Sequence, residues 1–539
     1  MNRCRPYDVA ERGSRFSLRN CVVLGLLLFL QADFLQTGPA QAAEDIQYLI
    51  FMIETEGLYE ASQDHVFARI DRRVTDLVDR VGAVGDGKTH HLGFGLLIPP
   101  WLIEKALPGK LPIVVREAFR VAEKRNVAVY FAIETHYIWD ARPDLWNYFD
   151  PKRPGYDPAN KNNVEWMDWK GTPHPNRYLD WGKPQKLPPH MCYNCPAILS
   201  EVTRLASQVL APPIRKGIED LRKADQEYLF AGMTVGSEPS LDDYSRIETV
   251  NPALARLMEQ NKAPKVRLGY NALTEAGYSE TNPPRDYSQA LAEINRDFIA
   301  FWAKAFVQAG LSKTRLYTHV AANAGVVGSP TVEFTNAPAW IAYNDYSRMG
   351  WTTYPDGPLA KDFNLLYAEL AKHGHPHWGG TEANPVGLSG NSVPMEDYLR
   401  RHYDHGATVV VMNAGATDPH LAERLEKGIW SVDAKRAYGR FLTGRLSAPA
   451  AAIADAKNAP SDDRCAPPAA AWTGLSREER LRAKLKAFES AAQPWLKRGG
   501  DGRKVSTFVQ QFDQQLKSGD PTGAEATLDQ AIGTVCEGR

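Results

Sequence analysis

The run LFAGMTVG (229–236) is a short apolar stretch that is followed at once by Ser237 and Glu238. A second run, HWGGTE (377–382), closes on a carboxylate in the same way, at Glu382. Short, nearly continuous apolar runs of this kind are typical of parallel strands that are covered on both faces. Each glutamate is therefore expected at or just beyond the end of a buried strand.

Six further runs of this kind occur, and longer segments with helical periodicity lie between them. In chain order the eight runs are YLIFMIE (48–54), LGFGLLI (92–98), VAVYFAIE (127–134), LFAGMTVG (229–236), RLYTHVA (315–321), RMGWTTY (348–354), HWGGTE (377–382) and ATVVVMNA (407–414). The helical segments are 113–125, 197–226, 288–309, 361–373, 395–405 and 419–442. Gly310, Gly374 and Gly406 stand just before a run, which suits the end of a helix. AWIAYND (339–345) competes with RMGWTTY for the sixth place.

Strand and helix alternating eight times predict an α/β fold, a (β/α)8 TIM barrel. The alternative is an open doubly wound sheet, but Glu54, Thr55 and Glu56 follow the first run where a dinucleotide-binding sheet has a glycine-rich turn. Two long insertions follow the third and fourth strands, at 139–195 and from 239 to about 287. Both are expected on the C-terminal rim, where barrel enzymes keep their active sites.

The two ends of the chain differ from the barrel in composition. Residues 1–42 show the order of a secretory signal, with arginines, a short apolar core and the small-residue site Ala40-Gln41-Ala42. This predicts a periplasmic or secreted protein, the alternative being an uncleaved anchor helix. The barrel is expected over 44–445, an Ala/Pro-rich linker over 446–474 and a small helical domain over 475–539.

Export favours disulfides for the four cysteines that remain after the signal. We predict the pairs Cys192 with Cys195 and Cys465 with Cys536. A zinc site at His190, Cys192 and Cys195 is an alternative that lacks a second matched pair of ligands. A thioredoxin-type redox role is a further alternative, but the surrounding sequence does not resemble the βαβ unit in which such motifs occur.

The overall charge argues against a polyanionic partner. Lys and Arg total 63 against 64 Asp and Glu, so there is no surplus of the kind that nucleic-acid-binding proteins carry. Beyond the signal no run of about 18 apolar residues occurs, so no stable membrane insertion is expected after cleavage.

The aromatic rings of the first insertion suggest a carbohydrate partner, because sugar C–H faces stack on rings. Trp139 and Trp146 are expected nearest the cleft, unless such rings form the insertion's own core. The oligomeric state is left open.

The two glutamates suit one kind of chemistry. Cleavage of a glycosidic bond needs a proton for the departing oxygen and an anionic group facing the developing positive charge, and two carboxyl groups meet both needs. Strands four and seven lie across a barrel from each other. Glu238 and Glu382 can therefore reach a substrate lying between them.

Here the chain resembles the clan A retaining glycoside hydrolases over roughly residues 45–445. The resemblance is carried locally by Gly236-Ser237-Glu238-Pro239 and by Gly380-Thr381-Glu382-Ala383-Asn384. It implies that Glu238 is the acid/base and Glu382 the nucleophile, and that Tyr354 hydrogen-bonds the nucleophile. Members of the clan usually have Asn directly before the acid/base glutamate, where this chain has Ser237.

Other polar residues near the predicted strand ends are candidates for contacts with the sugar. They are Glu134, His136, His319, Asn323, Asn384 and Asn413. Glu54 or Glu56 could replace one of the pair in an inverting mechanism. His373, His375 and His377 precede strand seven at the opposite end of the barrel and are interpreted as loop residues. No cofactor and no metal are expected.

The leading hypothesis is an exported glycoside hydrolase that cleaves a poly- or oligosaccharide by retention, with Glu238 and Glu382 as the working pair. A non-catalytic carbohydrate-binding barrel of an exopolysaccharide system is the alternative from another class. A metal-dependent barrel hydrolase is a third interpretation, which metal analysis would test.

Overall fold

The computed structural model of the 539-residue chain describes two compact units, divided between Leu446 and Ser447. In the first unit the described residues are 46–180, 183–321, 336–355, 363–387, 392–415 and 418–446. In the second they are 502–518, 520–536 and the positions 476, 480, 481, 484, 485, 487, 488, 491, 492 and 495. The predicted signal peptide, the linker beyond Leu446 and Asn323 lie outside the described residues.

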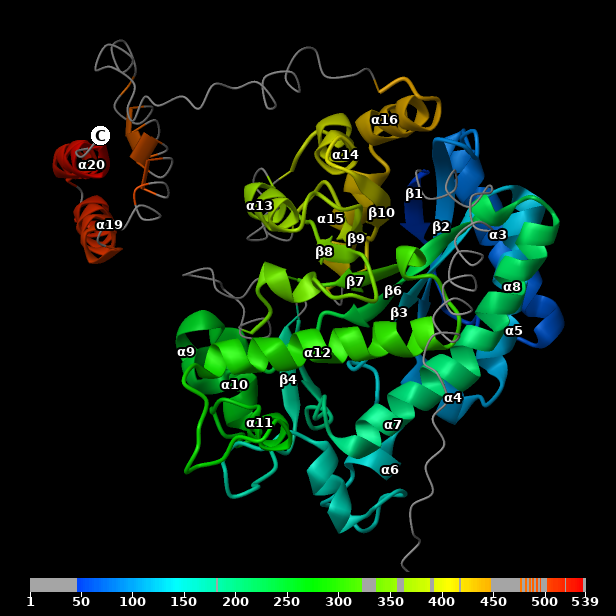
Figure 1. The fold of residues 1–539 in the computed structure, drawn as a ribbon, viewed down its shortest axis with the longest axis horizontal. Coiled ribbons are helices and arrows are strands. Elements are labelled where there is room, and N and C mark those ends of the chain that lie inside the picture. Colours follow the sequence, from blue (N-terminus) through cyan, green and yellow to red (C-terminus); the bar gives the residue numbers. More distant parts are fainter. Residues whose placement is uncertain are drawn as a thin grey trace, which may run out of the picture. The chain divides into compact units, whose positions relative to one another are not determined.

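Eight parallel strands form the centre of the first unit (Figure 1). They are β1 (Gln47–Met52), β2 (His90–Ile98), β3 (Ala128–Ile133), β6 (Phe230–Ser237), β7 (Leu316–His319), β8 (Met349–Thr352), β9 (Trp378–Ala383) and β10 (Ala407–Met412). Their order in the sheet is β7-β6-β3-β2-β1-β10-β9-β8. Each strand corresponds to one of the eight apolar runs.

Backbone hydrogen bonds between β7 and β8 bring the two edges of this sheet together. The amide of Thr318 donates to the carbonyl of Arg348 at 2.9 Å, and the amide of Thr352 donates to the carbonyl of Val320 at 3.0 Å. The sheet is therefore a nearly closed barrel, which confirms the predicted TIM barrel and excludes the open sheet. The competing segment for the sixth strand contains a short 3-10 helix, η6 (Ala339–Ala342).

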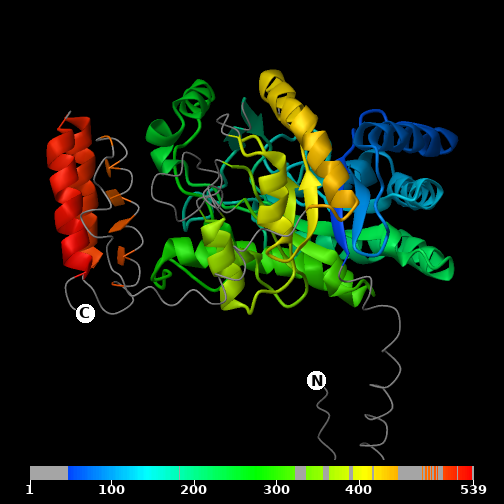
Figure 2. The ribbon, with the colours of Figure 1, turned by 90° about the horizontal axis from the view of Figure 1, so that it is seen from above.

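The helices lie outside the strands (Figures 1 and 2). They are α3 (Gln63–Val81), α4 (Pro100–Ala106), α5 (Lys110–Arg125), α7 (Pro196–Arg204), η2 (Leu205–Leu210), α8 (Ala211–Lys223), α12 (Tyr287–Gln308), α13 (Asn364–Lys372), α14 (Met395–Tyr403), α15 (Pro419–Ile429) and α16 (Val432–Leu442). The predicted helix 197–226 is divided by the π-helical turn η2, and α3 is a helix that the sequence analysis did not predict. Gly310, Gly374 and Gly406 all have positive φ, as expected just after a helix end.

Alternation along the strands separates two layers of core. Tyr48 and Ile50 of β1 pack inside the barrel with Tyr130 and Tyr317, in a cluster distinct from the outer one. Their neighbour Leu49 belongs to the outer layer, which also contains the buried faces of the surrounding helices. Because successive side chains of a strand point to opposite faces, a strand that is apolar throughout fills both layers.

The two long insertions pack against each other. The first contains α6 (Pro143–Trp146), η1 (Pro158–Asn163) and the antiparallel pair β4 (Arg177–Asp180) and β5 (Pro184–Leu187). The second contains η4 (Tyr244–Arg246), α9 (Ile247–Val250), α10 (Pro252–Gln260) and α11 (Tyr270–Glu275). Tyr178 of the first shares a buried cluster with Tyr244, Leu254 and Met258 of the second. The insertions thus have a core of their own beside the barrel.

The structure confirms the predicted disulfide between Cys192 and Cys195, which lies buried in the first insertion. Cys536 is also disulfide-bonded. Its predicted partner, Cys465, lies outside the described residues.

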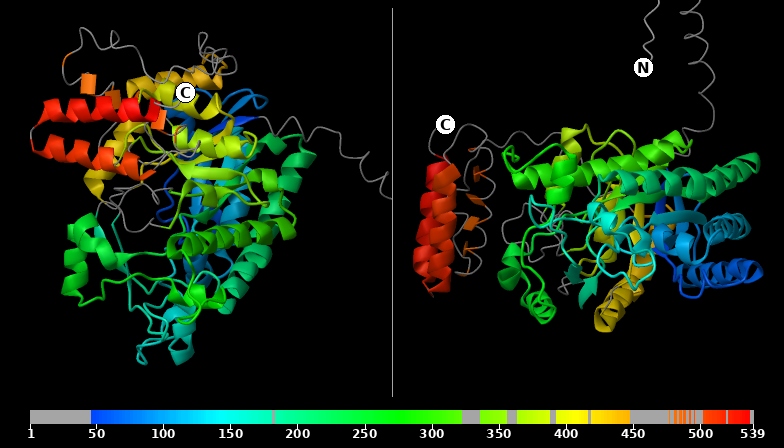
Figure 3. Two further views of the ribbon diagram at one scale, coloured as in Figure 1. Left: turned by 60° about the vertical axis from the view of Figure 1, so that its left-hand side comes forward. Right: turned by 90° about the horizontal axis from the view of Figure 1, so that it is seen from below.

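In the second unit α19 (Gly502–Lys517) and α20 (Pro521–Cys536) run side by side (Figure 3). Leu528, Ala531 and Val535 of α20 are buried, in a cluster that includes Phe488. Across the part of the chain that the structure describes, none of the helices has the length and apolar character needed to cross a bilayer.

Candidate active site

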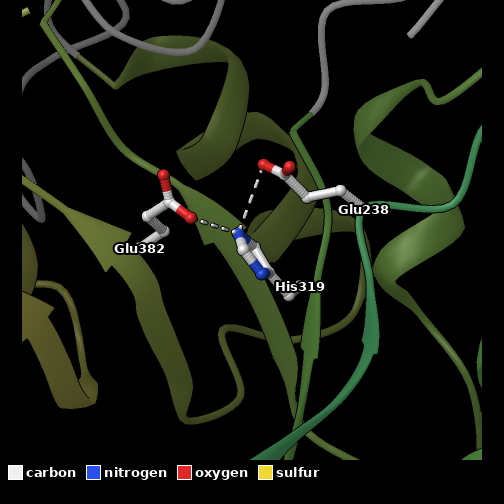
Figure 4. Close-up of side chains that lie close together, drawn as sticks. All are labelled: Glu238, His319 and Glu382. Carbon is white, nitrogen blue, oxygen red and sulfur yellow. Dashed lines mark ion pairs between the residues drawn. The ribbon is translucent and has the colours of Figure 1, made fainter. Parts of the chain in front are cut away.

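The two predicted catalytic glutamates meet at the C-terminal end of the barrel. Glu238 directly follows β6, Glu382 lies near the end of β9, and His319 is the last residue of β7. Parallel strands of a barrel all end on the same rim, so side chains from these strands can converge although they are far apart in sequence. Figure 4 shows the imidazole of His319 between the two carboxylates.

The chain turns sharply at Glu238. Gly236 has φ 71° and Glu238 has φ 42°, a positive value that is uncommon for a residue other than glycine. The amide of Glu238 donates to the carbonyl of His319 at 2.8 Å, and the hydroxyl of Tyr137 donates to the carbonyl of Glu238 at 3.2 Å. Such conformations are strained and persist where the surroundings hold them, often at functional sites. Here the surrounding bonds hold Glu238 at the end of β6.

His319 links the two glutamates. Its Nε2 lies 3.4 Å from Oε1 of Glu238 and 3.6 Å from Oε2 of Glu382. The same nitrogen is 2.9 Å from the hydroxyl oxygen of Thr352, which in turn donates to Oε1 of Glu238 at 2.9 Å. Since the single proton of the Thr352 hydroxyl goes to Glu238, its oxygen accepts the proton on Nε2 of His319. A continuous hydrogen-bonded path therefore joins His319 to Glu238.

Ser237 contacts the other ring nitrogen of His319. Its hydroxyl oxygen lies 3.4 Å from Nδ1 of His319. Ser237 occupies the position at which the clan A glycoside hydrolases usually have Asn. In this protein it contacts His319 on the side of the ring that faces away from the two carboxylates.

Glu382 is held by a different donor. The hydroxyl of Tyr354 donates to its Oε1 at 2.8 Å, and the nearby side chain of Asn413 works with it to lower the pKa of this carboxyl. Its side chain is 25% exposed, compared with 12% for Glu238 and 8% for His319. Glu382 is therefore the member of the group that solvent reaches most easily.

Burial and mutual charge set the protonation of the three groups. Burial and the Glu238 carboxylate raise the pKa of Glu382, although His319, Tyr354 and Asn413 oppose this. Burial also works to raise the pKa of Glu238, but the nearby charge of His319 and the hydrogen bond from Thr352 outweigh it, and the pKa is lowered. Burial lowers the pKa of His319, but both carboxylates outweigh it and the pKa is raised. In the substrate-free protein a shared proton is thus favoured on Glu382 over Glu238.

Glu134 and His136 lie on the same rim but are buried. The Glu134 carboxylate accepts the backbone amides of His136 and Tyr137, both at 3.1 Å, so it caps the turn after β3. The ring of His136 is 2% exposed and packs against Tyr193 and Phe298. A contact of these two residues with sugar stays a prediction.

Trp139 and Trp146 do not have the predicted placement. Each is only 2% exposed, and the indole nitrogen of Trp146 donates to the carbonyl of Trp139 at 3.1 Å. A ring this deeply buried cannot present a face to a sugar, so both belong to the interior of the insertion. Among the described residues of the insertion, Phe149 and Tyr156 are the large exposed rings.

Asn384 also has a structural role instead of the predicted sugar contact. It is fully buried, its amide donates to the carbonyls of Asn413 and Leu425, and its oxygen accepts the amide of Val386. All of its polar atoms are used within the protein, so it positions the segment that carries Glu382 and Asn413.

Glu54, offered as a second carboxylate for an inverting mechanism, faces solvent. Its side chain is 84% exposed and lies 3.9 Å from Arg73.

Thr352 is a site residue that the sequence did not predict. Its position in the sequence could have indicated it. Thr352 lies two residues before Tyr354, and alternate residues of an extended segment face the same side, so both side chains face the site.

Three of these side chains form the donor set that could hold a metal ion. One ligand atom each from Glu238, His319 and Glu382 lie within 4.8 Å of one another.

Comparison with known proteins adds little to this site. No protein-family model and no curated protein matches the sequence. Solved structures with a related course of the chain include that of TcOYE with pHBA, at 11% identity and a TM-score of 0.33, covering 74% of this chain and 95% of that one. A chitobiase from Flavobacterium johnsoniae matches at 10% identity and a TM-score of 0.31, covering 90% of this chain and 69% of that one. Similarity at this level carries no argument about the chemistry of the site.

Proposed function

We propose that this protein is an exported glycoside hydrolase that cleaves a poly- or oligosaccharide with retention of configuration. The observation that carries the proposal is the approach of carboxylate oxygens of Glu238 and Glu382 to within 4.8 Å at the C-terminal rim of the barrel. Retaining glycosidases hold their two carboxyl groups about 5–5.5 Å apart, and inverting enzymes about 6.5–9.5 Å apart to admit a water. The close approach of single oxygens from the two groups supports direct attack by a carboxylate.

In the first step a carboxylate oxygen of Glu382 attacks the anomeric carbon while Glu238 gives its proton to the departing glycosidic oxygen. The bond between the anomeric carbon and that oxygen breaks as the bond to Glu382 forms. In the second step Glu238 removes a proton from a water, the water oxygen attacks the anomeric carbon, and Glu382 is released. Two inversions give net retention.

The environments of the two glutamates support this division of roles. Tyr354 donates to Glu382, which orients it and stabilises the carboxylate that leaves in the second step. The turn at Glu238 is held by Tyr137 and by the backbone of β7. A group that must exchange a proton in both steps needs a fixed position relative to the leaving oxygen.

The role of Glu238 requires a proton on this residue once the sugar is bound, whereas the substrate-free protein favours the proton on Glu382. Thr352 offers a route for the transfer. Its hydroxyl accepts from Nε2 of His319 and donates to Oε1 of Glu238. One exchange at the hydroxyl moves the Nε2 proton of His319 to Glu238, and the proton of Glu382 replaces it on Nε2, so Glu382 becomes the carboxylate that attacks, without any movement of the backbone.

The proposal of export rests on the sequence of residues 1–42. Their order of charged, apolar and small residues is that of a secretory signal. N-terminal sequencing of the protein recovered from the periplasm or culture medium tests this. The recovered chain should begin directly after Ala42.

The central experiment is a screen of polysaccharides, in which the anomeric form of the first product is read by NMR before mutarotation. The product should keep the configuration of the substrate. Glu382→Gln should abolish turnover while sugar binding persists, and Glu54→Gln, an exposed glutamate after β1, should behave as wild type. Binding without turnover by the wild-type protein on every substrate would instead indicate a non-catalytic carbohydrate-binding barrel.

A further inference from the structure

The spacing of donor atoms around His319 matches that of ligands around a divalent cation. Zn²⁺ binds imidazole nitrogen and carboxylate oxygen at about 2.0–2.1 Å, which places neighbouring ligand atoms of a tetrahedral site about 3.3 Å apart. Nε2 of His319 lies 3.4 Å from Glu238 and 3.6 Å from Glu382. Both separations are already near the value that a bound ion requires.

The two carboxylate oxygens need only a small closing movement. They lie within 4.8 Å of each other, and Glu382 is the more exposed of the two. Rotation of the Glu382 side chain toward His319 would bring all three donors around one point. The solvent-facing side of Glu382 leaves a fourth position for water, as in zinc sites with three protein ligands.

Each of the three donors also has an outer contact that orients it. Ser237 lies against Nδ1 of His319, Thr352 donates to Glu238, and Tyr354 donates to Glu382. Histidines and carboxylates that bind metals are held in this way by a second set of hydrogen bonds. The site is therefore organised beyond the mere proximity of acidic groups.

The charge of the site favours a cation. Among the residues that the structure describes, His319 makes the ion pairs of Glu238 and Glu382, and no lysine or arginine pairs with either carboxylate. An imidazole nitrogen favours ions that are borderline between hard and soft, such as Zn²⁺. It disfavours the hard ion Mg²⁺, which prefers oxygen ligands.

We propose that Glu238, His319 and Glu382 form a binding site for a borderline divalent cation such as Zn²⁺, and that the bound ion inhibits the enzyme. The binding site stands on the geometry alone. Inhibition rests on the proposed function, because an ion that takes up both carboxylates leaves neither the nucleophile nor the acid/base free to act on a sugar.

The test is titration of the full-length exported protein, first stripped with EDTA and dialysed, with ZnCl₂ and separately with MgCl₂ in a calorimeter. We expect one Zn²⁺ equivalent to bind at this site and Mg²⁺ to bind at least tenfold more weakly. His319→Gln should remove that equivalent. Glu382→Gln, at a more exposed position, should weaken binding by at least tenfold and serves as the second variant if His319→Gln does not fold.

Surface histidines need a matched control. His373, His375 and His377 alternate in the loop before β9 and could also bind Zn²⁺. His375→Gln should leave the equivalent that depends on His319 unchanged. Loss of binding in His375→Gln, together with full binding in His319→Gln, would place the ion at the loop and overturn the proposal.

Activity assays separate this proposal from the proposed function. Zn²⁺ that inhibits hydrolysis, with full activity restored by EDTA, supports both. Binding that depends on His319 in a protein with no glycosidase activity in either state supports the site and overturns the function. Activity without any Zn²⁺ binding overturns the site and leaves the function standing. Activity that disappears with EDTA and returns with Zn²⁺ overturns inhibition and indicates a metal-dependent hydrolase.

Discussion

The hydroxyl of Tyr354 donates a hydrogen bond of 2.8 Å to Oε1 of Glu382. The bond joins the segment after β8 to the neighbouring strand β9. It fixes the carboxylate that we propose as the nucleophile and leaves its other oxygen, Oε2, toward His319. Hydrogen bonds to charged groups are among the stronger ones in proteins, so this contact should matter for rate.

We expect Tyr354→Phe to lower kcat by roughly 10- to 100-fold, since a hydrogen bond to a charged group contributes about 1.5–3 kcal/mol. The ring is retained, so the fold and the affinity for sugar should change little. Tyr343→Phe, which alters a 43% exposed tyrosine, is the control and should have no effect. An unchanged kcat in Tyr354→Phe would show that this bond does not position the nucleophile.

Azide should distinguish the roles of the two glutamates. Each is replaced by alanine, and an activated aryl glycoside is supplied with sodium azide. In Glu382→Ala azide replaces the nucleophile, so the glycosyl azide should have the configuration opposite to the substrate. In Glu238→Ala azide attacks the glycosyl enzyme, so the configuration should be retained. The loss before rescue should be about 10²- to 10⁴-fold for Glu238→Ala. Exchanged outcomes would reverse the assignment of roles.

The buried pair of Arg177 and Asp242 should stabilise the junction of the two insertions. The guanidinium makes two bonds to the carboxylate, at 2.9 and 3.2 Å, and lies over the ring of Tyr137, which bonds the Glu238 carbonyl. Arg177→Met leaves a buried carboxylate without its partner, so the free energy of unfolding should fall by about 3–5 kcal/mol.

Lys216→Met breaks an exposed pair with Asp220 and provides the comparison for Arg177→Met. Because both side chains face solvent, it should leave the free energy of unfolding almost unchanged. Both variants are measured by denaturant unfolding of the full chain. Equal losses would mean that burial adds nothing to the pair of Arg177 and Asp242.

Glu165 should make stability depend on pH. It is fully buried, and burial raises its pKa from 4.5 to about 8. Between these values the folded protein keeps a proton that the unfolded chain has released, so stability falls as pH rises through this window and levels off above it. Its Oε1 and the side-chain oxygen of Asn271 have no hydrogen-bond partner among the described atoms, which agrees with a neutral acid.

Glu165→Gln removes the titrating group and should flatten the decline of melting temperature between pH 5 and pH 8. At pH 8 the variant should melt above the wild type. An equally steep decline in both proteins would mean that other groups set the dependence.

Several features of the fold follow from local pattern. The eight strands, the turn glycines Gly310, Gly374 and Gly406, and the pairing of Cys192 with Cys195 were all predictable. Apolar runs too short for helices, separated by helical segments, leave few folds other than a barrel. Two glutamates at strand ends then had to share one rim.

Other features depended on contacts between distant segments. His319 was one of several polar residues near strand ends, and only the closure of β7 onto β8 brings it between the carboxylates with Thr352 beside it. Trp139 and Trp146 carried the same sequence signal as rings exposed for sugar binding, yet they are buried.

The sequence by itself determined the strands and the rim on which Glu238 and Glu382 stand, because strand periodicity is a property of neighbouring residues. Only the tertiary structure decided which side chains surround the two carboxylates and which aromatic rings face solvent. The physical reason is that burial and hydrogen bonding depend on the segments that pack against a residue, and in a barrel those segments come from distant parts of the chain.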